Sequence, residues 1–320
     1  MSPEVVKRMA EIVLHHYPAS PYAEKIRAIL GFKNLRWKSV TIPAMMPKPD
    51  VVALTGGYRR TPVAQIGADV YCDSGLIARA IDNFAPSPTL YAYGDTLAAS
   101  ALTYFAESVL FNTCVALAFT PATIKVFFPD VTPEFLEAFR NDRVAMRKGG
   151  TVRRGPINEC RAAVLHFLPK IESQFRDGRP FVFGSTASMA DFGLYHTLWP
   201  VWRAPGVRAI LNPFPKTDAF VERIAALGHG KPEAITSTQA LDIAKSAKRA
   251  PFGRGIAIEL EGLKLGDTVE VLPVDYAFDP VRGELLTASA DEIVVRREDP
   301  RAGILQVHFP RFGYELRRAG

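Results

Sequence analysis

The segment "LHHYPASPYAEKIRAIL" (residues 14–30) changes character halfway along its length. It continues an apolar run, Ile12 to Leu14, that is typical of a short buried strand, and then turns through the proline-punctuated corner "YPASP" (17–21). A helix is predicted directly afterwards, from Tyr22 to Gly31, because apolar positions recur along it and a glycine stops it. Since the first turn of a helix leaves N–H groups unpaired, Ser20 is placed either to cap the helix or to act in a catalytic or anion site.

Strands and helices continue to alternate to about residue 90. "LRWKSVTIP" (35–43) predicts a second strand, and a short helix through Leu54 follows it. "PVAQIGADVYC" (62–72) predicts a hairpin that turns at Gly67, and "GLIARAIDNF" (75–84) predicts a further helix. The order β-α-β-α-β-β-α is that of an α/β layer that ends in an antiparallel pair.

The rest of the chain divides into a helical part and a β part. Helical periodicity from Asp95 to about Ala247 predicts a bundle of about six helices. The last residues contain short β-branched segments separated by Gly, Asp and Pro, which predict a small SH3-like barrel. We therefore predict three domains: an α/β domain (1–90), an all-helical domain (91–247) and a small β-barrel (248–320).

Composition limits the classes of function. The net charge of the 320 residues is only +6, and the basic clusters are pairs such as Arg59-Arg60, which argues against nucleic acid. The three cysteines lack the spacing of a disulfide framework, and the first eighteen residues do not form a signal peptide. The most apolar window, Val109–Phe119, is shorter than the ~20 residues of a membrane span. These features predict a cytoplasmic protein without a membrane segment, and the scattered histidines predict no metal site.

The α/β layer followed by a helical domain resembles the cytosolic glutathione transferase family, over roughly residues 11–247. "SPYAEKIR" (20–27) resembles the family corner that places a Ser or Cys at the glutathione sulfur. The resemblance implies that the Ser20 hydroxyl donates to the thiolate and, with the helix N-terminus, lowers the pKa of the thiol. Tyr17 is the reserve candidate, and a simple helix cap remains the alternative for Ser20.

Two further segments resemble glutathione-binding elements. In "YRRTPVAQI" (58–66) the resemblance implies a cis bond before Pro62, with the backbone of Val63 pairing with glutathione; an ordinary strand-initiating proline is the alternative. Asp73 and Ser74 match the pair that holds the γ-glutamyl end, although they also suit a helix N-cap. The usual lysine of the family loop is displaced, so Arg59 or Arg60 is expected to hold the glycyl carboxylate.

A last motif supports the helical domain, because "FGSTASMADFGLYHTLW" (183–199) resembles the family's capping box, with Ser188 and Asp191 capping each other. The resemblance implies a homodimer that uses glutathione as cosubstrate, without a permanently bound cofactor. Glutathione would attack a small hydrophobic electrophile in conjugation, isomerisation or peroxide reduction. The alternative is a non-catalytic scaffold of the same fold, whose C-terminal β domain binds a protein partner.

Overall fold

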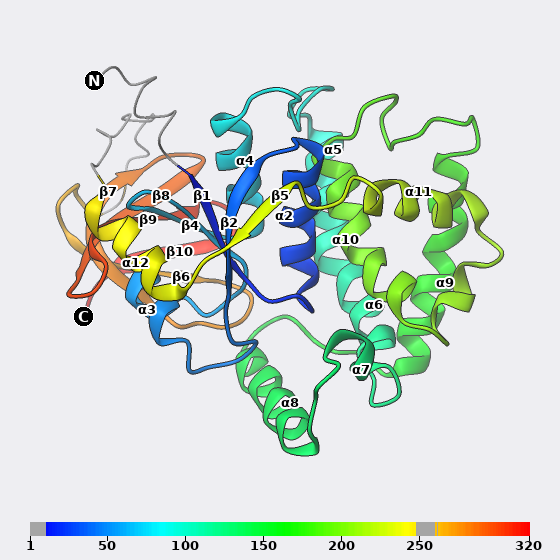
Figure 1. The fold of residues 1–320 in the computed structure, drawn as a ribbon, viewed down its shortest axis with the longest axis horizontal. Coiled ribbons are helices and arrows are strands. Elements are labelled where there is room, and N and C mark those ends of the chain that lie inside the picture. Colours follow the sequence, from blue (N-terminus) through cyan, green and yellow to red (C-terminus); the bar gives the residue numbers. More distant parts are fainter. Residues whose placement is uncertain (1–10, 248–259, 261) are drawn as a thin grey trace.

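One ten-stranded sheet, in the order β10-β6-β7-β8-β9-β4-β3-β1-β2-β5, runs through the molecule. The computed structural model describes residues 11–247, 260 and 262–320. Figure 1 shows the sheet on one side of the molecule and most of the helices on the other, with α2 (Pro21–Phe32) between them. The candidate site described below lies where these two halves meet.

The N-terminal part has the predicted α/β order. Its strands are β1 (Ile12–His16), β2 (Arg36–Thr41), β3 (Val63–Ile66) and β4 (Asp69–Cys72), and its other helices are α3 (Pro49–Thr55) and α4 (Ser74–Phe84). β1 is parallel to β2 and antiparallel to β3, and β3 and β4 form the predicted hairpin. An unpredicted short strand, β5 (Lys231–Ala234), adds to β2; all four of its residues are exposed, so no apolar alternation marked it.

The helical part is built around α10 (Met189–Arg203), which contacts α2, α5, α6 and α11. Its predicted capping box is confirmed: the Ser188 N–H and hydroxyl each donate to Asp191 Oδ2 at 2.8 Å. The other elements are α5 (Leu97–Phe105), the π-helical turn η1 (Ala106–Leu110), α6 (Phe111–Ala118), α7 (Ile124–Phe127), α8 (Pro133–Arg147), α9 (Ile157–Gln174), the 3₁₀ turn η2 (Arg208–Leu211), α11 (Pro215–Ala225) and α12 (Ser237–Ser246).

α12 differs from the sequence-based expectation, and a second helix is longer than its most apolar window. α12 packs on α3, β2 and β9 of the sheet side rather than joining the bundle, because Ala240, Leu241 and Ala244 complete the core there. α5, η1 and α6 form one continuous helix of 22 residues, Leu97–Ala118, which is longer than the apolar window considered above. By length and composition this helix could cross a membrane, as could many core helices, and α6 packs against α9 and α10.

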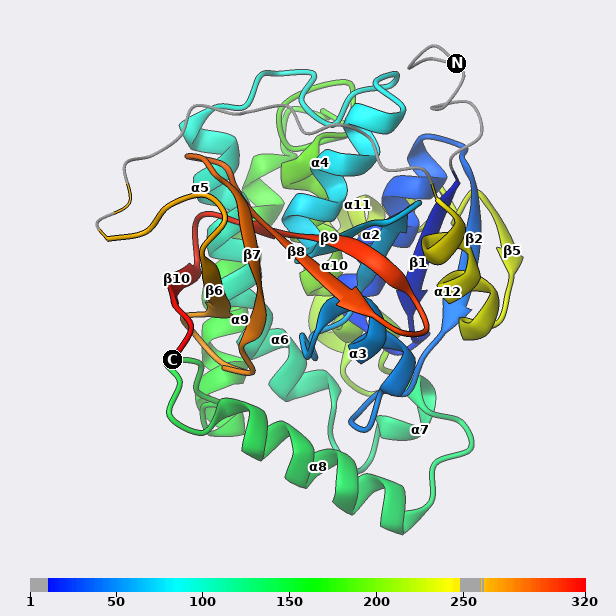
Figure 2. The same ribbon diagram turned by 90° about the vertical axis from the view of Figure 1, so that its left-hand side faces the viewer.

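The C-terminal strands extend the N-terminal sheet, and the SH3-like barrel is not confirmed. They are β6 (Thr268–Pro273), β7 (Val281–Ala288), β8 (Glu292–Asp299), β9 (Gly303–Pro310) and an unpredicted β10 (Tyr314–Arg318). β9 pairs parallel to β4, with Val70 opposite Val307 (Figure 2). This pairing satisfies backbone groups that the edge of β4 would otherwise expose. Of the predicted first strand, "GIAIEL" (255–260), only Leu260 lies within the described residues.

His308 joins the two parts of the sheet. Its buried ring lies on β9, contacts Glu292 through Nδ1 and Asp69 of β4 through Nε2 at 3.3 Å, and stacks on Tyr71. Burial alone would lower the pKa of His308, but hydrogen bonds to Asp69 and Glu292 raise it above its ordinary value. The native protein therefore holds a proton on this ring at a pH where the unfolded chain has lost it.

We expect the stabilisation contributed by His308 to decline with rising pH. Because its folded pKa is raised, this contribution is fully present below about pH 6.5, the unfolded value, and is lost as pH rises through the folded pKa. Urea denaturation of the wild type and His308→Gln at several pH values would show a stability difference that shrinks as pH increases. His166→Gln, at an exposed position of α9, is the control. A difference that stays constant with pH would contradict the assignment.

Candidate functional site

A cavity of about 1690 Å³ lies between the α/β layer, the helical part and the C-terminal strands. Its walls include the β1–α2 corner, the start of α4, α5 to α8, and the loops that follow β6 and β9. Most of the residues predicted from the sequence line it: Tyr17, Ser20, Arg60, Pro62, Asp73 and Ser74. Arg59 and Val63 are not among its lining residues.

Ser20 is the N-cap of α2 and is only 2% exposed. Its Oγ accepts a hydrogen bond from Ala23 N at 3.2 Å, and Pro21 takes the first helical position. Within the described part of the chain no acceptor is recorded for the hydroxyl proton. Because a serine hydroxyl can accept and donate at once, capping the helix leaves Ser20 able to donate to a group in the cavity.

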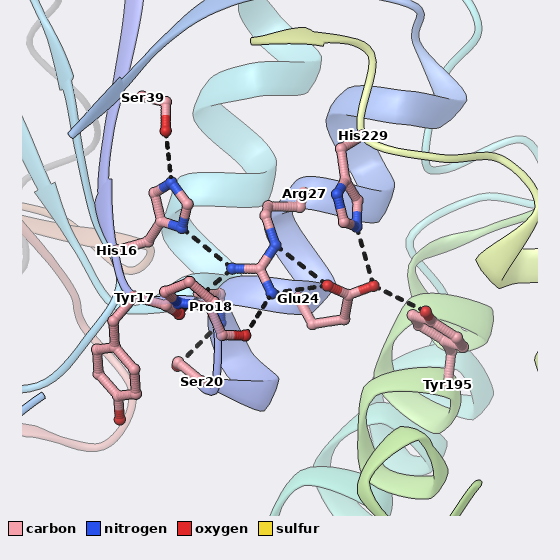
Figure 3. Close-up of polar contacts among 10 residues, drawn as sticks. His16, Tyr17, Pro18, Ser20, Glu24, Arg27, Ser39, Tyr195 and His229 are labelled. Carbon is pink, nitrogen blue, oxygen red and sulfur yellow. Dashed lines mark hydrogen bonds and ion pairs between the residues drawn. The ribbon is translucent and has the colours of Figure 1, made fainter. Parts of the chain in front are cut away.

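The corner that carries Ser20 is held by Arg27, about two turns further along α2 (Figure 3). The guanidinium donates to the carbonyl oxygen of Pro18 at 3.0 Å and lies 3.0 Å from His16 Nδ1. Burial and the positive charge of Arg27 lower the pKa of His16 to about 3, so the ring is neutral and Nδ1 accepts from Arg27. The sequence motif contained Arg27, but nothing local indicated that it folds back on the corner.

Glu24 links the β1–α2 corner to α10 and to the segment that precedes β5. Arg27 donates to its Oε2 at 3.1 and 2.7 Å, while Tyr195 of α10 donates to Oε1 at 2.8 Å. His229, which precedes β5, lies 3.1 Å from the same Oε1 (Figure 3). Burial would raise the pKa of Glu24, but the His229 hydrogen bond and the charge of Arg27 outweigh it and lower this pKa. The carboxylate is therefore ionised and fully partnered, which fixes the start of α2 against the helical part.

The Thr61–Pro62 bond is cis, as predicted. Thr61 and Pro62 line the cavity, whereas Val63 is completely buried in the sheet, between His15 of β1 and Cys72 of β4. Lys48, which the sequence analysis did not single out, supports this loop by donating to Thr61 Oγ1 at 2.9 Å. Burial, with the charge of Arg143, lowers the pKa of Lys48 to about 7.

The two candidate arginines have different partners. Arg59 pairs with Asp142 of α8 at 2.5 Å. Arg60 is bonded to the Asp275 carboxylate and the Tyr276 carbonyl, and its guanidinium stacks 3.9 Å from the centre of the Tyr276 ring. The C-terminal strands therefore bring a carboxylate and a tyrosine to the site, from positions that no sequence signal connected with residue 60.

Asp73 and Ser74 lie at the N-terminus of α4. Asp73 has a φ of 76°, uncommon for a non-glycine residue, and its Oδ1 accepts from Gly75 N at 2.8 Å. Tyr314 of β10 lies 3.5 Å from Asp73 Oδ2 and 3.0 Å from the Tyr58 hydroxyl. Burial raises the pKa of Asp73, while the charge of Lys25 opposes this shift. The cavity thus contains a carboxylate and a hydroxyl at the N-terminus of a helix, which suits a ligand with both an ammonium and a carboxylate.

Comparison with known proteins identifies both halves of the predicted architecture. The glutathione S-transferase N-terminal domain model matches residues 14–89, and the C-terminal domain model matches residues 154–223. The crystal structure of a GST-like protein from Pseudomonas syringae is 38% identical, with a TM-score of 0.81 over 97% of this chain and 100% of that chain. Glutathione transferase GSTFuA3 from Phanerochaete chrysosporium is 19% identical, with a TM-score of 0.51 over 68% of this chain and 97% of that one. No curated protein matches the chain.

Proposed function

Because the chain belongs to the glutathione S-transferase family, we propose that it binds glutathione in this cavity and activates the thiol for attack on an electrophile. The observation that carries the proposal is the Ser20 hydroxyl. Its oxygen caps α2, and its proton can be donated to a group bound in the cavity. A hydrogen bond from Ser20 and the positive end of α2 both favour the thiolate, so the thiol loses its proton to solvent near neutral pH. The thiolate then forms the bond to the electrophile.

The proposed binding mode is supported by the residues that line the cavity. Ser74 and the first N–H groups of α4 would hold the γ-glutamyl carboxylate, and Asp73 would hold the ammonium group. Thr61 is the proposed backbone partner of the cysteinyl unit, since it faces the cavity and Val63 does not. Of the two candidate arginines, Arg60 is the proposed partner of the glycyl carboxylate. Its guanidinium would then bind both this carboxylate and Asp275.

Two properties of the family are carried over as proposals. We propose a homodimer, as is typical of glutathione transferases, and a cytoplasmic location. The location is supported by the cysteines Cys72, Cys114 and Cys160, all of which are free and buried. The electrophile is proposed to have an apolar part, because aromatic side chains such as Phe119 and Phe128 line the cavity.

We expect Asp73→Asn and Ser74→Ala each to weaken glutathione binding about tenfold, the size expected for losing one charge-assisted hydrogen bond. Isothermal titration measures this, and Ser100→Ala, at an exposed cavity-lining serine of α5, is the matched control. Because burial raises the pKa of Asp73, wild-type binding should weaken as pH falls through that raised value, whereas Asp73→Asn should not show this loss. Unchanged affinity in both variants would refute the γ-glutamyl assignment, and a wild type that does not bind immobilised glutathione would refute the proposed function.

A further inference from the structure

One face of α8 brings arginine side chains to the cavity. Arg140, Arg143 and Arg147 are spaced three and four residues apart, so they lie on the same side of the helix. Arg153 and Arg154 follow in the next loop, and all five arginines line the cavity. In Figures 1 and 2, α8 crosses the lower end of the molecule, below the α/β layer and the bundle.

Two of these arginines already have structural partners. Arg143 donates to the Ala44 carbonyl at 2.5 Å and lies 3.0 Å from Asp142, while Arg154 donates to the carbonyl oxygens of Ala116 and Phe119. For the other three no hydrogen bond or ion pair is recorded among residues 11–247, 260 and 262–320: Arg140, Arg147 and Arg153. Their donors are therefore available to a ligand.

The charge around these arginines is not balanced within the cavity. Glu137 of α8 lines the same face, but no cation lies within 4.0 Å of it in the described part of the chain. Five further acidic residues line the cavity. Asp95, Glu107 and Asp275 are paired with Arg79, Lys25 and Arg60 respectively. Asp73 caps α4, and Asp291 lies in the turn between β7 and β8, so neither belongs to the α8 end of the cavity. Burial and the positive charges of Arg154 and Arg143 lower the pKa of Arg147. The α8 end of the cavity thus carries an excess of positive charge.

Aromatic rings lie beside this charge. Phe128 and Phe139 line the cavity with their ring centres 5.3 Å apart, and Phe139 is next to Arg140 on α8. A flat apolar group can pack on these rings while an attached oxyanion accepts from the guanidinium groups. A purely hydrophobic substrate would leave those donors unused.

We propose that the electrophilic substrate is an aromatic compound with a carboxylate. Arg140 and Arg147 bind the carboxylate, while the rings of Phe128 and Phe139 pack against the aromatic ring of the substrate. This inference rests on the proposed function and specifies its substrate class. A chlorodinitrobenzoate is a suitable probe, and its carboxamide is the neutral match. The glutathione thiolate forms a bond to the ring carbon that carries chlorine, chloride leaves with the electron pair of the broken C–Cl bond, and the thiol proton is released to solvent.

The test compares kcat/KM for the acid and the amide, each divided by its uncatalysed rate with glutathione. The wild type should favour the acid about tenfold, and Arg140→Met and Arg147→Met should each remove most of this preference, because each deletes a charged hydrogen-bond donor. Arg147→Lys should retain part of it. Arg161→Met, at an exposed arginine of α9 outside the cavity, should leave the preference unchanged.

Two binding measurements separate this inference from the proposed function. The preformed glutathione conjugates of the acid and the amide are titrated into the wild type and Arg147→Met. The wild type should bind the acid conjugate more tightly than the amide conjugate, and the variant should lose this difference. That result supports the inference even if neither probe is turned over. Absence of turnover would then count against the proposed function alone. Equal binding of both conjugates would overturn the inference. A tenfold loss of affinity for glutathione itself in Arg147→Met would also overturn it, because the arginine would then hold glutathione.

Discussion

Replacing Ser20 with alanine lowers the rate of glutathione conjugation about 100-fold and leaves glutathione affinity nearly unchanged, if the hydroxyl stabilises the thiolate. The size is that expected when one oriented hydrogen-bond donor to an anion is deleted from an active site. Affinity is retained because the proposed γ-glutamyl contacts, at Asp73 and Ser74, lie on a different helix. The thiol pKa of bound glutathione, followed by the ultraviolet absorbance of the thiolate, should rise in the variant.

Because Ser20 also caps α2, the alanine variant loses about 1 kcal/mol of stability, whereas Ser20→Gly should lose only a few tenths. The glycine variant therefore separates the cap from the chemistry: it should be as inactive as Ser20→Ala but nearly as stable as the wild type. Tyr17→Phe tests the reserve candidate, whose ring also lines the cavity. Turnover of both Ser20 variants at the wild-type rate, with loss in Tyr17→Phe, would transfer the role to Tyr17.

Arg27→Met should destabilise the fold by about 3–5 kcal/mol, as expected when one member of a buried ion pair is removed. The side chains of Arg27 and Glu24 are 6% and 5% exposed, so the remaining carboxylate would lose its cation without gaining water. The carbonyl of Pro18 would lose its donor as well, which loosens the corner that presents Ser20. The same substitution should therefore reduce activity in the fraction that folds.

Urea denaturation measures this effect, and Arg179→Met is the matched control. Arg179 pairs with Asp177 at 2.6 Å on the surface, where such a pair contributes less than about 1 kcal/mol. The double variant Glu24→Leu/Arg27→Met should recover part of the stability, because it also removes the buried carboxylate that has lost the Arg27 cation. If Arg27→Met loses no more than Arg179→Met, the network does not hold the corner.

Much of the α/β layer was predictable from local patterns. The corner at Ser20, the helix caps and the β3–β4 hairpin depend on residues a few positions apart, and proline, glycine and capping side chains mark them in the sequence. The cis bond before Pro62 was expected from the resemblance to the family. In contrast, exposed β5 lacks apolar alternation and β10 is only five residues long, and neither was predicted.

The sequence alone was sufficient to identify the family, the helix N-termini that face the cavity and Ser20 among the lining residues. It could not show that β9 pairs with β4, that Arg60 bonds to Asp275, 215 residues further along the chain, or that α8 turns its arginines toward the same cavity. Capping and strand alternation are local properties, whereas these contacts depend on how distant segments pack. Most of the residues proposed to hold glutathione lie in local motifs, whereas those proposed to select its partner substrate are brought together only by the tertiary structure.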